Sequence, residues 1–490
     1  MRRRIFALLI LILLLTLTCV PGATAVTPGD YDASSPEMLE PTLLYAQSAI
    51  LIDEDSGTVL FEKNPDIAMH PASTTKIMTL LLGLERGIPL DREIAIPQAA
   101  ADVPGDSTLI PVYPGETMTY GDLLTAFTLS SGNDGANAVA VIVAGTIDNF
   151  VAMMNERAAQ IGCINTHFAN AHGYTDENHF TCASDLARIT RVAMANPTFR
   201  DLVRKTSATV HISGREDKTV YSQHLIMKES SEFYYKDCIG VKTGTTSAAG
   251  KCYVGAAERD GATLISVVLR CDTDEGRWID TARLFDYGWT RYETVTFDRL
   301  YRAASGQIAS CMVSNAKSDD VGGGRLELDI AQISDGSYKQ IIVRGNTADF
   351  QTLVDDFIRH ATVRITHDLS APITRGEIIG DLTYSSAENG RYITAKLVAS
   401  RDVEEKPSVL SLIDVFPFLK MLENKTFAIL LCVLALLVLL IVILAVSRSA
   451  QKQRRRREML ERRRAQTRRQ SAQYAMHSDT RKKSDVRRPR

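Results

Sequence analysis

The 490-residue sequence predicts an exported protein of mixed α/β class, with a mostly β second region and one membrane-spanning helix near its C-terminus. Three observations predict it. Strand-like and helix-like apolar spacings alternate up to about residue 290, strands and turns dominate from about 295 to 400, and an uninterrupted apolar run covers 427–446. With 45% hydrophobic and 23% charged residues, the chain can form two or three packed domains, which excludes disorder as its main state.

Residues 1–25 have the pattern of a secretory signal peptide. Arg2, Arg3 and Arg4 precede an uncharged run, and Ala23-Thr24-Ala25 supplies the small-x-small motif that a signal peptidase recognises. We therefore expect the mature chain to begin at Val26 and to lie outside the cytoplasm.

The second apolar run, Phe427–Val446, contains 20 residues without a charge, enough for a helix that crosses about 30 Å of hydrocarbon. The tail that follows, 447–490, holds 17 Lys and Arg against 4 Asp and Glu. Positive residues favour the cytoplasmic side, so we expect the tail inside and residues 26–426 outside. Attraction to anionic lipid explains the charge of the tail, with an RNA-binding arm as the alternative. Residues 403–426 form the connector to the membrane.

Residues 26–446 are strongly acidic, with 36 Lys and Arg against 54 Asp and Glu. Nucleic acid binding needs clustered basic residues, so this partner class is excluded for the main domains. Six cysteines lie in the exported part, too few for a disulfide scaffold and without a Cys-x-x-Cys pair for zinc. Cys238 with Cys252, and Cys163 with Cys182, are possible bridges; buried free thiols are the alternative.

The elements of the first region follow from apolar spacing and turn residues. Ser48–Asp53 and Thr58–Glu62 flank the turn Asp55-Ser56-Gly57 and predict a hairpin. The predicted helices are one from Pro71-Ala72-Ser73 to near Gly87, Leu123–Ser130, Ala136–Ala144, and Arg277–Trp289. The predicted strands are Cys238–Thr243, Cys252–Ala257 and Thr263–Leu269, with turns at Gly244–Gly250 and Asp260-Gly261. Residues 295–402 predict a smaller β domain. Its strands are separated by predicted turns at Gly322-Gly323-Gly324, Asp335-Gly336 and Asn389-Gly390.

Three short motifs carry the predicted chemistry. Ser73-Thr74-Thr75-Lys76 places a hydroxyl and an amine three positions apart at a helix start, where the two side chains share one face. A serine needs a base to act as a nucleophile, and a lysine can serve once burial or nearby positive charge lowers its pKa. Alone, this motif is more often a solvated helix start.

The other two motifs make the interpretation specific. Ser131-Gly132-Asn133 lies in a predicted loop between helices, and Lys242-Thr243-Gly244, followed by Thr245, lies at the end of a predicted strand. A Ser-x-x-Lys, a Ser-x-Asn and a Lys-Thr-Gly in this order form the signature of serine acyl-transferases that react with penicillin. The sequence has no Gly-x-Ser-x-Gly elbow, and His167, His172 and His179 lack the spacing of a metal site.

The sequence resembles the low-molecular-mass penicillin-binding proteins that act as serine-type D-alanyl-D-alanine carboxypeptidases. The resemblance extends over about residues 42–402 and includes the stretches AQSAILIDEDSGTVLFEK (46–63), PASTTKIMT (71–79), LSSGNDGANA (129–138), NTHFANAHG (165–173) and GVKTGTTSAAG (240–250). Ala171 stands where the family usually has proline, and Gly135 where it usually has alanine. The resemblance implies a β-lactamase/transpeptidase-like catalytic domain at 42–290, an antiparallel sheet covered by helices, and an all-β domain at 295–402.

The resemblance also implies the substrate and the site. The substrate would be a peptidoglycan stem peptide ending in D-Ala-D-Ala, with β-lactams as inhibitors and no metal or cofactor. Ser73 would attack the penultimate D-Ala with Lys76 as base, and Ser131 would protonate the leaving amine. The implied substrate contacts come from Asn133, Lys242, Thr243, Gly244 and Thr245, with backbone N–H groups of Ser73 and Thr245 as the oxyanion hole.

Three other functions remain as alternatives on this sequence. A D,D-endopeptidase or a β-lactamase of the same fold would use the same three motifs, although no Glu-x-x-Leu-Asn pattern of class A β-lactamases occurs. A catalytically inactive wall-binding protein is the alternative from a different class, and the intact Lys76 argues against it.

Overall fold

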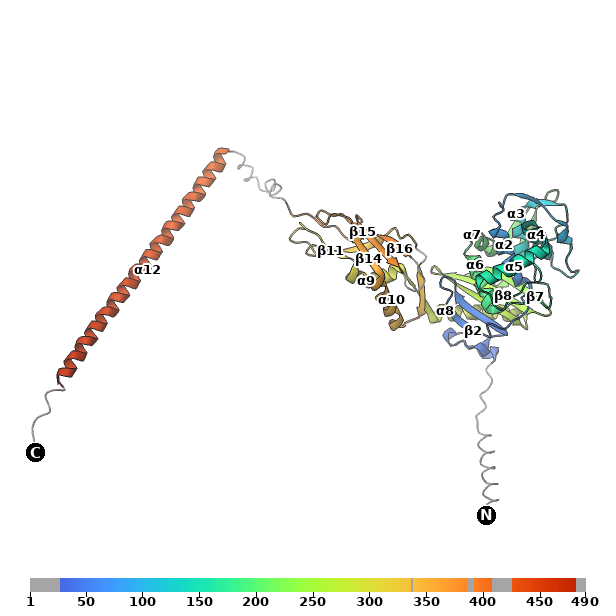
Figure 1. The fold of residues 1–490 in the computed structure, drawn as a ribbon, viewed down its shortest axis with the longest axis horizontal. Helices are drawn as coiled ribbons and strands as arrows, with labels where there is room; N and C mark the ends of the chain where they lie inside the picture. Colours follow the sequence, from blue (N-terminus) through green and yellow to red (C-terminus); the bar gives the residue numbers. More distant parts are fainter. Residues whose placement is uncertain (1–26, 336–337, 386–391, 408–424, 482–490) are drawn as a thin grey trace, which may run out of the picture. The chain divides into compact units, whose positions relative to one another are not determined.

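The computed structural model describes residues 27–335, 338–385, 392–407 and 425–481 (Figure 1). The predicted signal peptide and most of the predicted connector lie outside the described residues. The chain forms two compact units. The first comprises the residues up to Ser310 together with Glu327–His367 and Gly376–Ser400, and the second comprises Cys311–Leu326, Asp368–Arg375 and the chain from Arg401.

The central sheet of the first unit has five strands in the order β2-β1-β9-β8-β7, and neighbouring strands are antiparallel. The strands are β1 (Ser48–Asp53), β2 (Val59–Lys63), β7 (Cys238–Thr246), β8 (Gly250–Arg259) and β9 (Ala262–Cys271). The predicted hairpin is confirmed as β1 and β2. The pairing of β1 with β9 brings the beginning and the end of the first region together.

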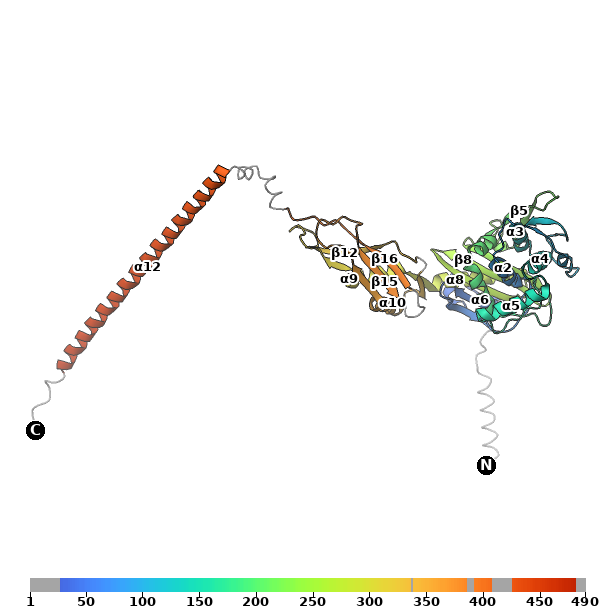
Figure 2. The same ribbon diagram turned by 45° about the horizontal axis from the view of Figure 1, so that its top comes forward.

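Both faces of this sheet are covered, as the alternation of buried side chains along β9 shows. Ile265, Val267 and Leu269 belong to the core under helices α2 to α7, which gather on one side of the sheet (Figure 2). Leu264 and Val268 belong to the core under α8 (Asp274–Arg291). Successive residues of a strand point to opposite faces, so a strand buried on both faces is apolar throughout.

The helices on the first face carry the predicted site. They are α2 (Lys76–Glu85), α3 (Tyr120–Ser130), α4 (Asn133–Ala144), α5 (Ile147–Ile161), α6 (Ala183–Met194) and α7 (Pro197–Arg204). A 3-10 turn, η4 (Ala72–Thr75), precedes α2. The antiparallel sheet covered by helices confirms the predicted fold class of the first region.

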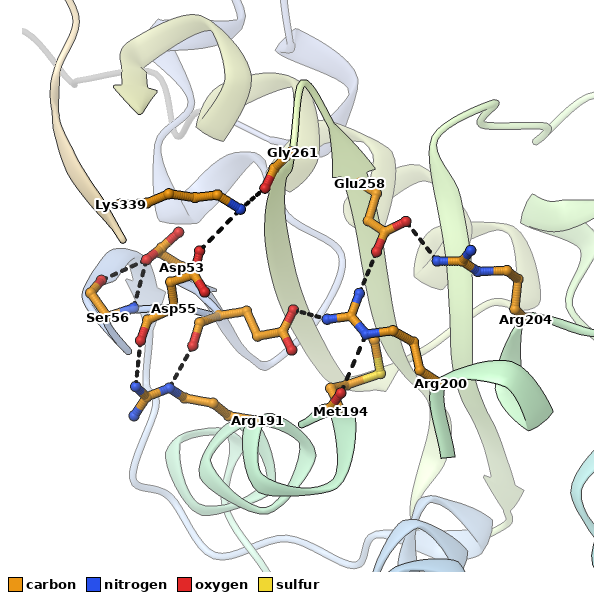
Figure 3. Close-up of polar contacts among 11 residues, drawn as sticks. Asp53, Asp55, Ser56, Arg191, Met194, Arg200, Arg204, Glu258, Gly261 and Lys339 are labelled. Atoms are coloured by element: carbon orange, nitrogen blue, oxygen red, sulfur yellow. Dashed lines mark hydrogen bonds and ion pairs between the residues drawn. The ribbon is translucent and has the colours of Figure 1, made fainter. Parts of the chain in front are cut away.

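Arginines of α6 and α7 attach this helical layer to the turns of the sheet (Figure 3). Arg191 donates to the Glu54 carbonyl at 2.6 Å. Arg200 pairs with both Glu54 and Glu258, and Arg204 pairs with Glu258 at 2.6 Å. A single exposed ion pair contributes little to the free energy of unfolding. A guanidinium that binds two carboxylates at once restricts the position of the helix that carries it. The network therefore holds α7, which supplies Phe199 and Val203 to the wall behind Lys76.

Two short antiparallel pairs join β3 (Glu93–Ala95) to β4 (Thr117–Thr119) and β5 (Ser207–Val210) to β6 (Lys218–Tyr221). A second, larger antiparallel sheet contains strands from the later part of the first unit. Four of its strands follow the order β12 (Arg325–Ala331), β16 (Tyr392–Ala399), β15 (Ile378–Ser385) and β14 (Ala361–Ile365). A separate pair joins β10 (Tyr292–Thr296) to β13 (Lys339–Val343). Lys339 donates to the Gly261 carbonyl and lies 3.4 Å from Asp55 (Figure 3).

The segment that the sequence predicts as all-β also contains two helices, α9 (Phe297–Ile308) and α10 (Thr347–His360). Phe297, Leu300, Tyr301 and Ala304 are buried on one face of α9. This i, i+3, i+4, i+7 spacing is the pattern of an amphipathic helix. Strand signals on either side of α9 outweighed this spacing in the prediction.

Two motif positions also differ from the prediction. Asn133 is the first residue of α4 and not part of a loop, because only Ser131 and Gly132 separate α3 from α4. Lys242-Thr243-Gly244 lies within β7 and not at its end, because the pairing with β8 continues to Thr246. The turn between β7 and β8 therefore contains only Ser247, Ala248 and Ala249.

All cysteines in the described residues are free thiols. In the register of β7 and β8, Cys238 is opposite Ala257 and Cys252 is opposite Gly244, so the two thiols do not face each other. Within the part of the chain that the structure covers, α12 (Lys425–Arg481) contains an apolar stretch long enough to cross a membrane. The pair α4 and α5, bent by 84°, is also long and apolar enough, but α4 and part of α5 are buried in the core of the first unit.

Candidate active site

Ser73 and Lys76 meet at the junction of η4 and α2, as their spacing predicts. The Lys76 Nζ lies 3.0 Å from the Ser73 Oγ, within hydrogen-bond distance. The same amine donates to the Asn133 Oδ1 at 2.7 Å and to the His172 carbonyl at 2.8 Å. Lys76 is only 2% exposed, whereas Ser73 faces a cavity. A buried amine thus lies within proton-transfer distance of an accessible hydroxyl.

The surroundings of Lys76 favour its neutral form. Burial lowers its pKa well below the ordinary value, and the positive charge of Lys242 lowers it further. The Asp134 carboxylate acts in the opposite direction, but it is held by backbone N–H groups of Ile110, Val112 and Gly135. A neutral lysine has a free electron pair, which a base needs to take the proton of a serine.

Asn133 joins this centre to a neighbouring loop. Its side-chain oxygen accepts from Lys76, and its Nδ2 donates to the Ser107 Oγ at 2.9 Å. Its backbone N–H donates to the Thr108 carbonyl at 2.7 Å. Ser131, two residues earlier, is buried with a left-handed backbone (φ 59°) at the end of α3. Among the described residues, Ser131 makes no hydrogen bond to Ser73 or Lys76.

Strand β7 brings the third motif against the Ser73 turn. A Cβ at Gly244 would lie 2.8 Å from the Pro71 carbonyl oxygen and 3.2 Å from the Ser73 backbone nitrogen, so only glycine permits this approach. Lys242 is 4% exposed, and its Nζ lies 3.3 Å from the Thr243 Oγ1. Burial lowers the pKa of Lys242 to about 7, and the charge of Arg277 adds to the effect.

A cavity of about 230 Å³ is lined by residues of the first two motifs and by Thr245, which directly follows the third. Ser73, Asn133 and Thr245 line it, together with Asp106, Ser107, Thr108, His172, Gly173, Tyr174, Thr175, Thr246 and Ser247. Lys76 and Lys242 do not line it; both line a small separate hollow together with Phe199 and Val203. A larger hollow of about 640 Å³, near Val59 and Tyr287, contains none of the predicted site residues.

Two groups near the site were missed by sequence reasoning. The His172 carbonyl holds Lys76, although the sequence suggested only a loop around this histidine. Burial lowers the pKa of the His172 ring to about 3, so the ring is neutral. Arg277 donates to the Thr245 Oγ1 at 3.2 Å and to the Gly244 carbonyl at 3.4 Å. The stretch around 165–173 was visible as a family resemblance, but a backbone carbonyl has no signature in a sequence.

Gly173 fixes the loop that supplies the His172 carbonyl, and Gly173→Ala is expected to damage both folding and acylation. Gly173 has φ +87°, and a Cβ there would lie 1.8 Å from the Ala72 carbonyl oxygen. Strain of this kind costs on the order of 1–3 kcal/mol or more. Urea unfolding and the rate of penicillin acylation measure the two effects. Gly162→Ala is the control, since Gly162 also has positive φ but open space around it. Equal effects of the two variants would contradict the steric explanation.

Comparisons with known proteins agree with this geometry. Residues 35–273 match the model of the family described as D-alanyl-D-alanine carboxypeptidase. The chain is 27% identical over 422 residues to the D-alanyl-D-alanine carboxypeptidase DacF of Bacillus subtilis (strain 168), covering 84% of this chain and 97% of that protein. It is 35% identical over 249 residues to DacB2 of Mycobacterium tuberculosis, covering 50% and 82%.

The fold is also similar to a solved structure. Penicillin binding protein 5 from Haemophilus influenzae matches with a TM-score of 0.50 and 26% identity, covering 75% of this chain and all of that one. The match covers most of the length of both relatives, and Ser73, Asn133 and Thr245 line one cavity in this chain. The chain therefore belongs to the serine D-alanyl-D-alanine carboxypeptidase family of low-molecular-mass penicillin-binding proteins.

Proposed function

We propose that this serine carboxypeptidase removes the terminal D-Ala from peptidoglycan pentapeptide stems through an acyl-enzyme on Ser73. The observation that carries the proposal is the 3.0 Å contact between the buried Lys76 amine and the Ser73 hydroxyl at the cavity wall. Lys76 takes the proton of Ser73 as its oxygen attacks the carbonyl of the penultimate D-Ala. General-base help of this kind contributes roughly 10²- to 10⁴-fold to the rate.

The negative charge on the attacked oxygen needs hydrogen-bond donors. We assign this role to the backbone N–H groups of Ser73 and Thr245, which the close approach of Gly244 to the Ser73 nitrogen supports. One such donor contributes about 3 kcal/mol to stabilisation of the transition state. Water then releases the acyl group and regenerates Ser73. β-Lactams would acylate the same oxygen.

The other motif residues bind the substrate in this proposal. Lys242, Thr243 and Thr245 hold the terminal carboxylate, which stabilises the charged form of Lys242. Asn133 orients the substrate amide, and Ser131 passes a proton to the leaving amine. The main support for Asn133 is its direct contact with Lys76.

We further propose the division of the chain. Residues 1–25 are the signal peptide, 42–290 the catalytic domain, 295–402 the β-rich domain, 403–426 the connector, 427–446 the membrane helix and 447–490 a cytoplasmic basic tail. The apolar part of α12 supports an anchor in the cytoplasmic membrane. The charge of the tail supports the orientation, with the catalytic domain outside the cytoplasm.

Product analysis tests the reaction. The full-length enzyme in detergent is incubated with monomeric pentapeptide and, separately, with cross-linked stem dimers. We expect one D-Ala released per pentapeptide, no cleavage of the dimers, and loss of activity after treatment with penicillin. Dimer cleavage would make the enzyme an endopeptidase, rapid turnover of penicillin would make it a β-lactamase, and penicillin binding without any product would indicate an inactive binder.

A further inference from the structure

The cavity at Ser73 has one negative charge on its wall. Of the twelve residues that line it, Asp106 is the only Asp, Glu, Lys or Arg, and it is exposed. The two lysines of the site are buried and are not among the residues that line this cavity. An exposed carboxylate in a cavity that must also bind a substrate carboxylate has an electrostatic cost unless it meets a positive group.

Asp106 is held in place from two sides. Its neighbour Ser107 accepts a hydrogen bond from Asn133, and Thr108 accepts one from the Asn133 backbone. From the opposite loop, the Tyr174 hydroxyl donates to the Asp106 Oδ1 at 3.0 Å. Tyr174 follows Gly173, which packs against Ala72. The carboxylate is therefore tied to the same groups that position Ser73 and Lys76.

The direction of the substrate decides what Asp106 can meet. With the terminal carboxylate at Lys242 and Thr245 and the attacked carbonyl at Ser73, the residue before the penultimate D-Ala leaves the cavity away from Lys242. Asp106, Ser107 and Tyr174 line the same cavity as Ser73, and Ser107 accepts a hydrogen bond from Asn133. A long side chain on that preceding residue can reach the carboxylate.

We infer that Asp106, positioned by Tyr174, recognises an ammonium group on the side chain of the residue that precedes the penultimate D-Ala. This inference rests on the proposed function, because the direction of the substrate follows from it. One oxygen of Asp106 accepts from Tyr174, and the other is available for the ammonium group. Charge-assisted hydrogen bonds are about twice as strong as neutral ones, so the pair favours diamino acids at this position.

The test compares two peptides that differ in one charge. Nα-acetyl-L-Lys-D-Ala-D-Ala carries a free ammonium group, and the Nα,Nε-diacetyl form does not. For the full-length enzyme we expect kcat/KM to be higher for the charged peptide by about three- to tenfold, mainly through KM. Asp106→Asn should make the two peptides equal, and Tyr174→Phe should reduce the ratio partly. High salt should reduce the wild-type ratio as well.

The controls separate this inference from the proposed reaction. Asp102→Asn removes a carboxylate of the same loop that does not line the cavity, and it should keep the wild-type ratio. Penicillin acylation by Asp102→Asn should also match the wild-type rate. An Asp106→Asn enzyme that retains the wild-type ratio would overturn the inference while D-Ala release still supported the reaction. Wild type without D-Ala release from either peptide would overturn the proposed function itself.

Discussion

Ser73→Ala is expected to abolish both covalent labelling by a fluorescent penicillin and release of D-Ala. The variant lacks the hydroxyl oxygen that lies next to the Lys76 amine at the cavity wall and acts as the nucleophile in the proposed reaction. Loss of a nucleophilic serine reduces turnover on the order of 10⁶-fold in a hydrolase where it has been measured, and the residual rate comes from binding and the oxyanion hole. Gel fluorescence after incubation with the labelled penicillin and an assay for free D-alanine measure the two losses.

This variant should still fold. Ser73 is partly exposed, and the buried Lys76 amine keeps its two other acceptors, Asn133 and the His172 carbonyl. Its free energy of unfolding should therefore stay within about 0.5 kcal/mol of wild type. Ser247→Ala is the matched control, because Ser247 lines the same cavity without touching Lys76. Labelling that persists in Ser73→Ala but disappears in Ser247→Ala would place the nucleophile at Ser247.

Much of the site was visible in the sequence because it depends on side-chain type. A hydroxyl and an amine three residues apart share a helix face wherever they occur, and the structure places Ser73 and Lys76 in contact. The contribution of His172 was invisible for the opposite reason, since it acts through its backbone carbonyl. The effect of Asp134 was also not visible in the sequence. Its charge raises the pKa of Lys76, and its carboxylate accepts from the backbone N–H of Ile110, a residue distant in the chain.

The fold shows a similar division. The β1 and β2 hairpin and the helix after Ser73 follow from local spacing and turn residues, and both are present. The extension of β7 past Gly244 depends on its pairing with β8, a contact that local patterns do not contain. Helix α9 was missed although its apolar residues have helical spacing, because strand signals on either side outweighed it.

Lys76→Arg is expected to slow penicillin acylation by roughly 10²- to 10⁴-fold, the contribution of a general base. Arginine supplies N–H donors at this position but does not lose its proton in proteins, so it has no electron pair to accept the serine proton. In wild type the acylation rate should rise with pH as Lys76 becomes neutral. Burial and Lys242 lower its pKa, so the plateau should be reached well below the pH at which an exposed lysine titrates. Stopped-flow or gel-based acylation rates across pH measure both effects.

Asp134→Asn tests the same assignment from the other direction. The Asp134 charge raises the pKa of Lys76, so its removal should move the rising limb of the acylation profile to lower pH. An unchanged limb, or an arginine variant that acylates at the wild-type rate, would contradict Lys76 as the base.

Stability gives an independent measure of the charge on Lys76. Its pKa is lower in the folded chain than in the unfolded chain, so the unfolded state binds more protons between the two values. The free energy of unfolding should therefore increase with pH across this window because of Lys76, and Lys76→Met should lose that contribution. Urea unfolding of both proteins at several pH values gives the difference directly. If the two proteins show the same slope, Lys76 is charged in the folded enzyme, and the serine must lose its proton to another group.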